Sequence, residues 1–188
     1  MQGTLLFLAS FLRNPAIVAG LPTSRTAARK IIQPITDVSI PQTIVELGPG
    51  SGPITKELLH PGVLHEKSRL IVIELQPELA AYLRRNIQDP RCTVIDGDAA
   101  NLHRILRRLG ILQIDALISG IPFSYLPHAV GHSITEQAAF LLKPGGKIVA
   151  YQVRPRVLGL LSKTFGAVHD KWLPWNFPPL RVFTAVKQ

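Results

Sequence analysis

The segment 45–52 combines an acidic residue with closely spaced glycines, a pattern suited to binding a ligand through the backbone. It contains Glu46, Gly48, Gly50, Ser51 and Gly52. Glycine has no side chain, so a glycine-rich turn lets its backbone approach a ligand closely. The G-x-G-x-G spacing differs from the G-x-G-x-x-G of pyrophosphate-binding loops. A carboxylate two residues before the first glycine favours a positively charged ligand over a phosphate.

Two further acidic residues follow the next two apolar segments of the chain. Glu74 ends the segment 69–74, where a carboxylate suits the hydroxyls of a ribose. Asp98 lies in the Asp-Gly-Asp-Ala segment 96–99, where it could accept a hydrogen bond from an adenine amino group. Either acid alone is more typical of a turn or a helix cap. Three such elements in order, on consecutive strand ends, indicate a nucleoside-binding site.

Short apolar runs that alternate with helical patterns position these residues. The sequence predicts strands at 43–47, 69–74, 92–95, 114–119 and 147–153, and helices at 54–59, 77–88, 101–109 and 127–142. This alternation predicts an α/β fold with a mostly parallel sheet and helices on both faces. After residue 153 the pattern becomes aromatic and Pro-rich, and a last strand at 182–186 could join the sheet edge.

Length and composition are consistent with one basic domain. The 188 residues, 46% of them hydrophobic, suffice for one core, so we expect a helical extension at 1–37 and an α/β core at 38–188. The net charge of +9 favours an anionic partner such as a membrane surface or nucleic acid. The single cysteine, Cys92, excludes an internal disulfide and fits a reducing cytoplasm, and we give it no functional role.

The N-terminal segment has an apolar stripe with cations nearby. Leu5, Leu8 and Leu12 recur at helical spacing, and Arg13, Arg25, Arg29 and Lys30 follow them. The apolar run is far shorter than the ~20 residues of a membrane-spanning helix. It predicts either an amphipathic helix on a membrane surface or a helix packed on the core.

The ordered set of motifs resembles the class I S-adenosylmethionine-dependent methyltransferases, which have a Rossmann-like fold. The Leu-Leu-Lys-Pro-Gly-Gly segment at 141–146 adds to this likeness. The resemblance implies that S-adenosylmethionine is the methyl donor and that its methionine end lies near Gly48–Gly52. It also implies that the ribose lies on Glu74 and the adenine near Asp98. The other expected donor-binding residues are Leu75, Ala99 and Ser119.

The segment after the fourth predicted strand is where the methyl acceptor should bind. Amine methyltransferases of DNA and rRNA have an Asn/Asp-Pro-Pro-aromatic or Asn-Leu-Pro-Tyr element here, and its amide or carboxylate receives the amino hydrogens of the base. Gly120 occupies that position in this chain. The lack of this hydrogen-bond acceptor argues against a flipped adenine as substrate, because nucleobase pockets depend on hydrogen bonds to the base edge.

The whole pattern is similar to the small bacterial phospholipid N-methyltransferases, which methylate phosphatidylethanolamine toward phosphatidylcholine. The likeness is carried by segments 11–15, 22–25, 119–122 and 175–179. It implies a cytoplasmic protein held peripherally at the inner face of the membrane, with a phospholipid as substrate. The expected substrate-binding residues are Gly120, Pro122, Phe123 and Arg154.

The remaining reactive side chains allow several roles. Tyr125, Tyr151 and His128 are candidate catalytic residues that could accept the amine proton directly or through water, and each could instead be a packing residue. Arg154 and Arg156 could hold a lipid phosphate or form a solvated pair. His128, His132 and Glu136 recur every four residues, but we interpret them as a polar helix face and expect no metal site.

Two other functions stay open at this point. One is an rRNA or other nucleic-acid adenine N6-methyltransferase with the same donor. The other is a non-catalytic lipid- or RNA-binding module that keeps the donor-binding fold. The sequence leaves the oligomeric state and the number of methyl transfers undetermined.

Overall fold

Within residues 23–188, which the computed structural model describes, seven strands form one sheet in the order β3-β2-β1-β4-β5-β7-β6. The strands are β1 Thr43–Leu47, β2 Arg69–Glu74, β3 Cys92–Asp96, β4 Ile114–Ser119, β5 Leu142–Gln152, β6 Val168–Leu173 and β7 Leu180–Val186. The first five are parallel to one another, whereas β7 is antiparallel to both β5 and β6. The predicted α/β fold with a mostly parallel, Rossmann-like sheet is confirmed.

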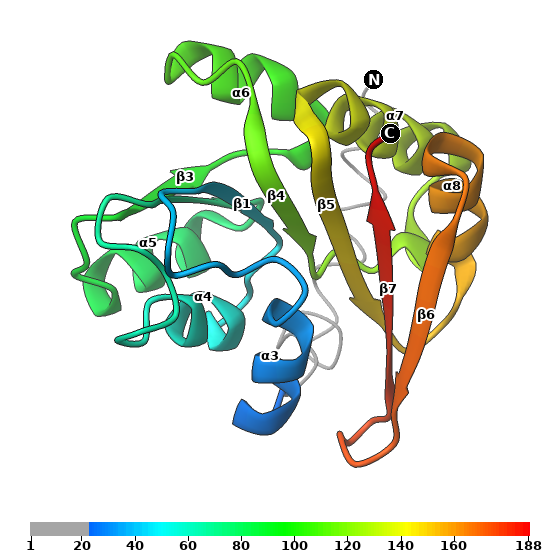
Figure 1. Cartoon of the computed structure of the whole chain (residues 1–188), viewed down its shortest axis with the longest axis horizontal. Coiled ribbons are helices and arrows are strands. Elements are labelled where there is room, and N and C mark those ends of the chain that lie inside the picture. Colours follow the sequence, from blue (N-terminus) through cyan, green and yellow to red (C-terminus); the bar gives the residue numbers. More distant parts are fainter. Residues whose placement is uncertain (1–22) are drawn as a thin grey trace.

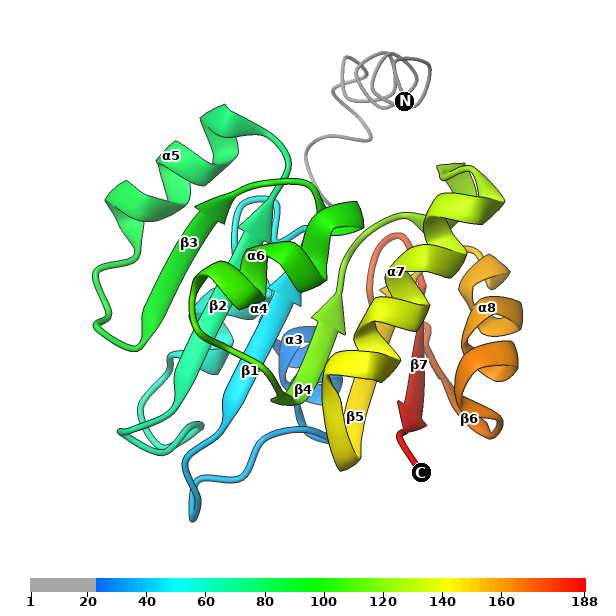
Figure 2. The same ribbon diagram turned by 90° about the horizontal axis from the view of Figure 1, so that it is seen from above.

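Helices cover both faces of this sheet, as Figures 1 and 2 show from two directions. They are α3 Arg25–Ile32, α4 Pro53–Leu58, α5 Pro77–Asn86, α6 Leu102–Arg108, α7 His128–Leu141 and α8 Arg156–Phe165, with short 3-10 turns at Ala99–Asn101 and Phe123–Tyr125. One core layer joins α3, α4 and α5 to the sheet, and the other joins α6, α7 and α8 to its opposite face. Alternate residues of the central strands enter alternate layers, because successive side chains of a strand point to opposite faces.

The strand register brings the chemistry-bearing residues to one edge of the sheet. Leu47 of β1 pairs with Ile73 and Ser119, the latter the last residue of β4, and Glu74 pairs with Asp96 at the end of β3. Parallel strands end at the same edge of a sheet. The loops that follow β1, β2, β3 and β4 therefore lie side by side.

The predicted C-terminal part needs correction. The last predicted strand lies inside the sheet, because β7 is hydrogen-bonded to β5 on one side and β6 on the other. The segment between β5 and β7, for which the sequence analysis gave only an aromatic and Pro-rich pattern, contains α8 and the edge strand β6. The fifth strand begins at Leu142 and so takes in the Pro-Gly-Gly turn, which bonds through Gly145 and Gly146 to Lys187.

The N-terminal part of the described chain lies along a face of the sheet. Of the predicted helical extension at 1–37, the structure describes α3, which packs beside α4 because Ala27, Ala28, Ile31 and Ile32 form its buried side. Ser24, just before α3, lines a cleft together with Ser51 of the glycine turn. Whether the extension as a whole covers the ligand-binding end stays a prediction. The predicted amphipathic stripe of Leu5, Leu8 and Leu12 lies outside the described residues. None of the helices in residues 23–188 is both long and apolar enough to cross a membrane.

Candidate active site

The glycine turn after β1 has a backbone conformation that favours glycine. Gly48, Gly50 and Gly52 have φ values of 65°, 59° and 81°, in the left-handed region. A Cβ at Gly52 would also lie 2.7 Å from Leu83 Cδ2. The turn therefore presents bare backbone between the end of β1 and the start of α4, as the sequence predicts.

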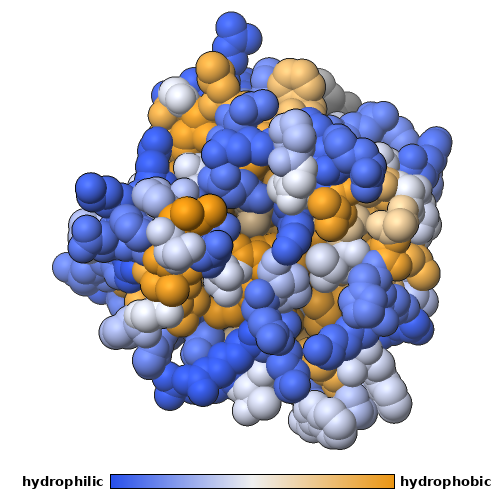
Figure 3. All heavy atoms as spheres, in the orientation of Figure 1, coloured by the Kyte–Doolittle hydropathy of each residue, from blue (hydrophilic) through white to orange (hydrophobic). Residues whose placement is uncertain are grey.

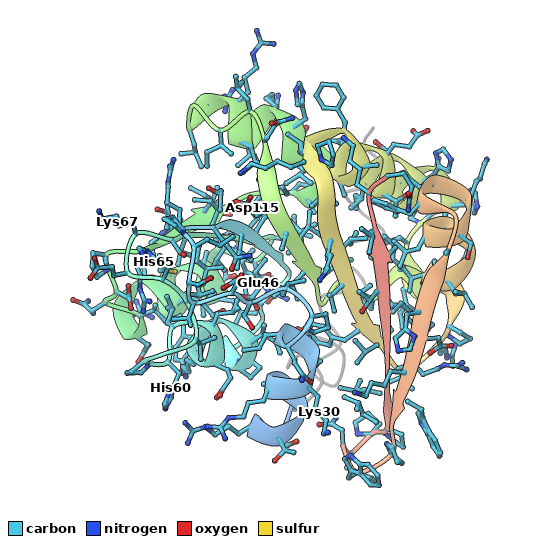
Figure 4. The ribbon with its side chains drawn as sticks, viewed as in Figure 1. Lys30, Glu46, His60, His65, Lys67 and Asp115 are labelled. Atoms are coloured by element: carbon cyan, nitrogen blue, oxygen red, sulfur yellow. The ribbon has the colours of Figure 1, made fainter. Side chains whose placement is uncertain are left out.

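Glu46 is a fully buried carboxylate next to this turn. Its Oε2 accepts a hydrogen bond of 2.7 Å from Thr55 Oγ1 of α4, and its Oε1 has no hydrogen-bond partner. Burial, with the nearby charge of Glu74, raises the pKa of Glu46 to about 8. Figure 4 shows this side chain inside the molecule. A buried acid with a free oxygen suits a cationic ligand group, since an unpaired buried carboxylate is otherwise costly.

Glu74 ties the end of β2 to the glycine turn. Its Oε2 accepts a hydrogen bond from the Gly50 N–H at 3.1 Å, and its Oε1 accepts one from the Gln76 N–H at 3.0 Å. Burial raises the pKa of Glu74, although these backbone donors partly oppose the rise. The half-buried Leu75 follows directly. The predicted ribose-binding acid thus also fixes the position of Gly50.

Asp98 begins the 3-10 turn after β3. Its Oδ1 accepts a hydrogen bond of 2.8 Å from the Ala100 N–H, and the adjacent Ala99 is buried. The structure thus brings Glu46, Glu74 and Asp98 to the ends of three adjacent strands. The unpartnered oxygen of Glu46 and the bare glycine turn are compatible with a ligand that carries a positive charge, as S-adenosylmethionine does. The placement of its methionine end at Gly48–Gly52, its ribose at Glu74 and its adenine at Asp98 stays a prediction.

Gly120 and Tyr151 lie against each other on the acceptor side of the turn. A Cβ at Gly120 would be 2.4 Å from the Tyr151 hydroxyl and 2.8 Å from the carbonyl oxygen of Gly48. Tyr151 is buried on β5, and burial, with the charges of Glu46 and Glu74, raises its pKa well above the usual range. Its phenol therefore stays protonated. The neighbouring Ser119 is buried, and its Oγ accepts a 3.3 Å hydrogen bond from the Ile121 N–H.

Three polar residues of this region are not among the predicted site residues. Thr55 holds Glu46, and its position in the helix after the glycine turn was a usable signal. Gln152, at the end of β5, donates through Nε2 to the Ile121 carbonyl at 2.8 Å, while its Oε1 is buried without a partner. The buried Oγ of Ser124 also has none. Polar groups of this kind suit a site that binds a polar ligand.

Other predicted acceptor residues lie on the surface or in the core. The Arg154 guanidinium lies 5.7 Å from the centroid of the Tyr125 ring, and both residues are exposed. Pro122 is exposed as well. Phe123 instead packs in the core layer of α7 and α8, so its side chain does not line an open site.

His128, the first residue of α7, is exposed and stacks on His132 with the ring centroids 6.2 Å apart. His132 in turn pairs with Glu136, at 3.2 Å between Nδ1 and Oε2. In the part of the chain that the structure describes, no three His, Cys, Asp or Glu side chains are grouped as metal ligands.

Comparisons with known proteins agree with this geometry. Residues 44–146 match a family model described as a methyltransferase domain. The chain is 30% identical to an ornithine lipid N-methyltransferase of Singulisphaera acidiphila over 95% of this chain and 93% of that protein. It is 31% identical to ribosomal RNA small subunit methyltransferase A of Chlorobium chlorochromatii over 63% of this chain, which spans 41% of that protein.

Among solved structures, the fold is similar to that of a precorrin-6y C5,15-methyltransferase from Geobacter metallireducens. The TM-score is 0.71 and the identity 16%, over 89% of this chain and 91% of that one.

Proposed function

Because this chain belongs to the S-adenosylmethionine-dependent methyltransferases, we propose that it transfers the methyl group to the amine of a membrane lipid head group. The proposed substrate is the amine of phosphatidylethanolamine, whose methylation leads to phosphatidylcholine. The protein would reach it from the cytoplasmic face of the membrane. The proposal rests on the acceptor side of the site more than on the donor side, which many methyltransferases share.

The observation that carries the proposal is the contact between Gly120 and Tyr151. Enzymes that methylate a base amino group have an amide or carboxylate side chain at the position of Gly120. A side chain there would begin 2.4 Å from the Tyr151 hydroxyl and 2.8 Å from the Gly48 carbonyl oxygen, which is too close for either. The acceptor amine therefore meets a phenol hydroxyl instead of a planar amide, and this arrangement favours a small aliphatic amine over a nucleobase.

The share of each relative's length that this chain covers also favours a lipid amine over a nucleobase. The ornithine lipid N-methyltransferase matches this chain over 93% of its own length, whereas the rRNA methyltransferase does so over 41%. The exposed pair of Arg154 and Tyr125 gives a place for a head group, since a guanidinium binds phosphate and an aromatic face favours a cationic amine.

The donor, when bound, supplies a methyl group already activated by its sulfonium. The chain must hold the acceptor nitrogen in line with that methyl group, and positioning of this kind supplies up to ~7–11 kcal/mol in favourable cases. The protonated Tyr151 can orient the nitrogen through its oxygen but cannot take a proton. Exposed Tyr125 and His128 remain the candidates that pass the amine proton to water.

Labelled methyl donor tests this function directly. The protein is incubated with anionic liposomes that contain phosphatidylethanolamine, with the same liposomes carrying an ornithine lipid instead, and with total RNA. Label in phosphatidylethanolamine supports the proposal, whereas label in the ornithine lipid alone would keep the lipid function and replace phosphatidylethanolamine as the substrate. Label in RNA alone would replace the lipid function by rRNA methylation, the alternative that the rRNA methyltransferase matches and the net charge of +9 favour.

A further inference from the structure

The turn between β6 and β7 exposes large aromatic side chains. Trp175 and Phe177 are 74% and 87% exposed, and Trp172 at the end of β6 is 63% exposed. These two tryptophans are the only ones in the chain. Elsewhere Phe123 and Phe183 are buried in the core, as large apolar rings usually are. Three exposed aromatic rings within six residues mark an interaction surface.

The turn that carries these rings is fixed to the rest of the protein. Asn176, between the two exposed rings, is buried. Its Oδ1 accepts a hydrogen bond of 3.0 Å from the Ser24 N–H at the start of α3, and its Nδ2 donates one of 2.9 Å to the Pro178 carbonyl. The exposure of the rings is therefore a property of an anchored turn.

This turn, which we call the aromatic tip (residues 172–178), lies beside the glycine turn. A cleft of about 460 Å³ separates them, lined by Ser51 and Pro53 on one side and by Trp175 and Phe177 on the other. In Figure 1 the tip is at the bottom, at the end toward which β4 and β5 point. A surface that touched the tip would thus also face the opening of the active site.

Cations lie next to the aromatic tip along the chain and on α3. Lys171 precedes the tip and is exposed. Arg25 and Arg29 lie on α3, which Asn176 joins to the tip; the two share the single carboxylate of Glu57, so they keep a net positive charge, and 60% and 58% of their side chains stay exposed. Lys30, labelled in Figure 4, is a further cation of α3. In Figure 3 the lowest part of the molecule, where the tip lies, carries pale atoms in place of the deep blue of charged groups. Interfacial aromatic rings bordered by cations are suited to an anionic lipid surface.

We infer that the aromatic tip is the membrane-docking surface of this enzyme, with Trp175 and Phe177 inserted among lipid head groups. The inference rests on the proposed lipid function and adds an orientation: the glycine turn and Arg154 side of the sheet face the membrane. An amine head group then reaches the site without leaving the bilayer. This docking surface is built wholly from described residues, independent of the segment before Thr23.

The experiment uses Trp175 as its own probe. In a Trp172→Phe protein, Trp175 fluorescence is followed as vesicles of phosphatidylglycerol and phosphatidylethanolamine are added, and vesicle sedimentation is measured in parallel. A blue shift and co-sedimentation are expected. In the otherwise unaltered chain, Trp175→Ser with Phe177→Ser should weaken vesicle binding about 100-fold, or roughly tenfold for each buried ring. The control Phe140→Ser removes an equally exposed ring (68%) from α7 and should not weaken it.

Methylation of phosphatidylethanolamine in vesicles and in detergent micelles separates this inference from the proposed function. The double variant should lower the ratio of vesicle rate to micelle rate about tenfold. An unshifted Trp175 spectrum, vesicle binding equal to that of the Phe140→Ser protein, or dimerisation through the tip in place of vesicle binding would each overturn the inference. If the lipid is methylated in micelles while the tip proves inert, only the docking surface is wrong; if no lipid is methylated although Trp175 inserts, the proposed function fails.

Discussion

Replacing Glu46 with glutamine should stabilise the free protein and weaken its affinity for the donor. The pKa of Glu46 is raised from 4.5 to about 8 because the side chain is buried. A carboxyl with a raised pKa contributes stability that is complete below its unfolded pKa and is lost as the pH rises through the folded pKa. At about 1.4 kcal/mol per pH unit, the free energy of unfolding of the donor-free protein falls by roughly 5 kcal/mol between about pH 4.5 and about pH 8. It falls because this carboxyl ionises in the unfolded chain while it stays protonated in the folded protein. Glu46→Gln should remove most of that decline.

Donor binding should depend on pH in the opposite direction. A cationic donor binds the ionised form of Glu46, so below about pH 8 each binding event must first release a proton. The association constant should therefore rise by up to about tenfold per pH unit between about pH 6 and about pH 8, and then level off. In Glu46→Gln this slope should shrink to the part contributed by Glu74, whose pKa burial also raises. Tyr151 and Cys92, whose pKa values burial and the charge of Glu46 also raise, stay protonated throughout this range.

Calorimetric titration with S-adenosylmethionine at several pH values, together with urea unfolding of the free protein, measures both effects. Glu57→Gln is the matched control, because Glu57 is another buried acid, on α4, and it pairs with Arg25 and Arg29 rather than lying next to the glycine turn. It should leave the slope of donor affinity unchanged. An affinity that is flat from about pH 6 to about pH 9, or a Glu46→Gln protein with the slope of the unaltered chain, would refute the assignment of Glu46 to the donor.

Substitutions at three further positions test other parts of the site. Gly50→Val should abolish donor binding by calorimetry while the circular dichroism spectrum is kept, because a β-branched residue is strained at φ 59° and its side chain would fill the turn; unchanged affinity would contradict this. Asp98→Ala should cost about 1 kcal/mol of stability from the lost bond to the Ala100 N–H and about tenfold in donor affinity, and Asp98→Asn should restore the stability more than the affinity. Tyr151→Phe should lower kcat about tenfold or more with the donor Kd unchanged. An equal loss of kcat and of donor affinity would assign Tyr151 to packing.

The parallel half of the fold was readable from sequence because its signals are local. Strands at 43–47, 69–74 and 114–119 have their predicted bounds, since each is a short apolar run ended by a turn. The ends of these strands carry Glu46 and Glu74, so the meeting of these two acids at one edge of the sheet followed from the same pattern. The left-handed backbone conformation at Gly48, Gly50 and Gly52 is likewise consistent with the close spacing of glycines in this turn.

The C-terminal part was not readable because its signals are weak or non-local. Strand β6 carries His169, Asp170 and Lys171, as exposed edge strands often carry charged residues, and this hides the alternation of a strand. Helix α8 contains Gly159, although Val157, Leu160 and Leu161 recur on its buried face and could have indicated it. The position of β7 between β5 and β6 depends on long-range pairing that no local pattern specifies.

The acceptor side of the site could not be predicted from the sequence either, because it also depends on contacts between residues that are far apart in the chain. The absence of an amide at position 120 was visible, but what fills that space comes from Tyr151, which follows 31 residues later on another strand. Phe123, which follows the same strand end as Gly120, was expected at the substrate and instead belongs to the core.

Spacing identifies the residues that a turn presents, whereas the register of β4 against β5 decides which side chains meet. Under the proposed function, consecutive motifs encode the donor side of the site, and a contact between neighbouring strands governs the choice of acceptor. Substitutions that change the acceptor without changing the donor should therefore be sought at the Gly120–Tyr151 contact, where exchange of both residues together is needed because a larger residue at 120 alone meets the phenol at 2.4 Å.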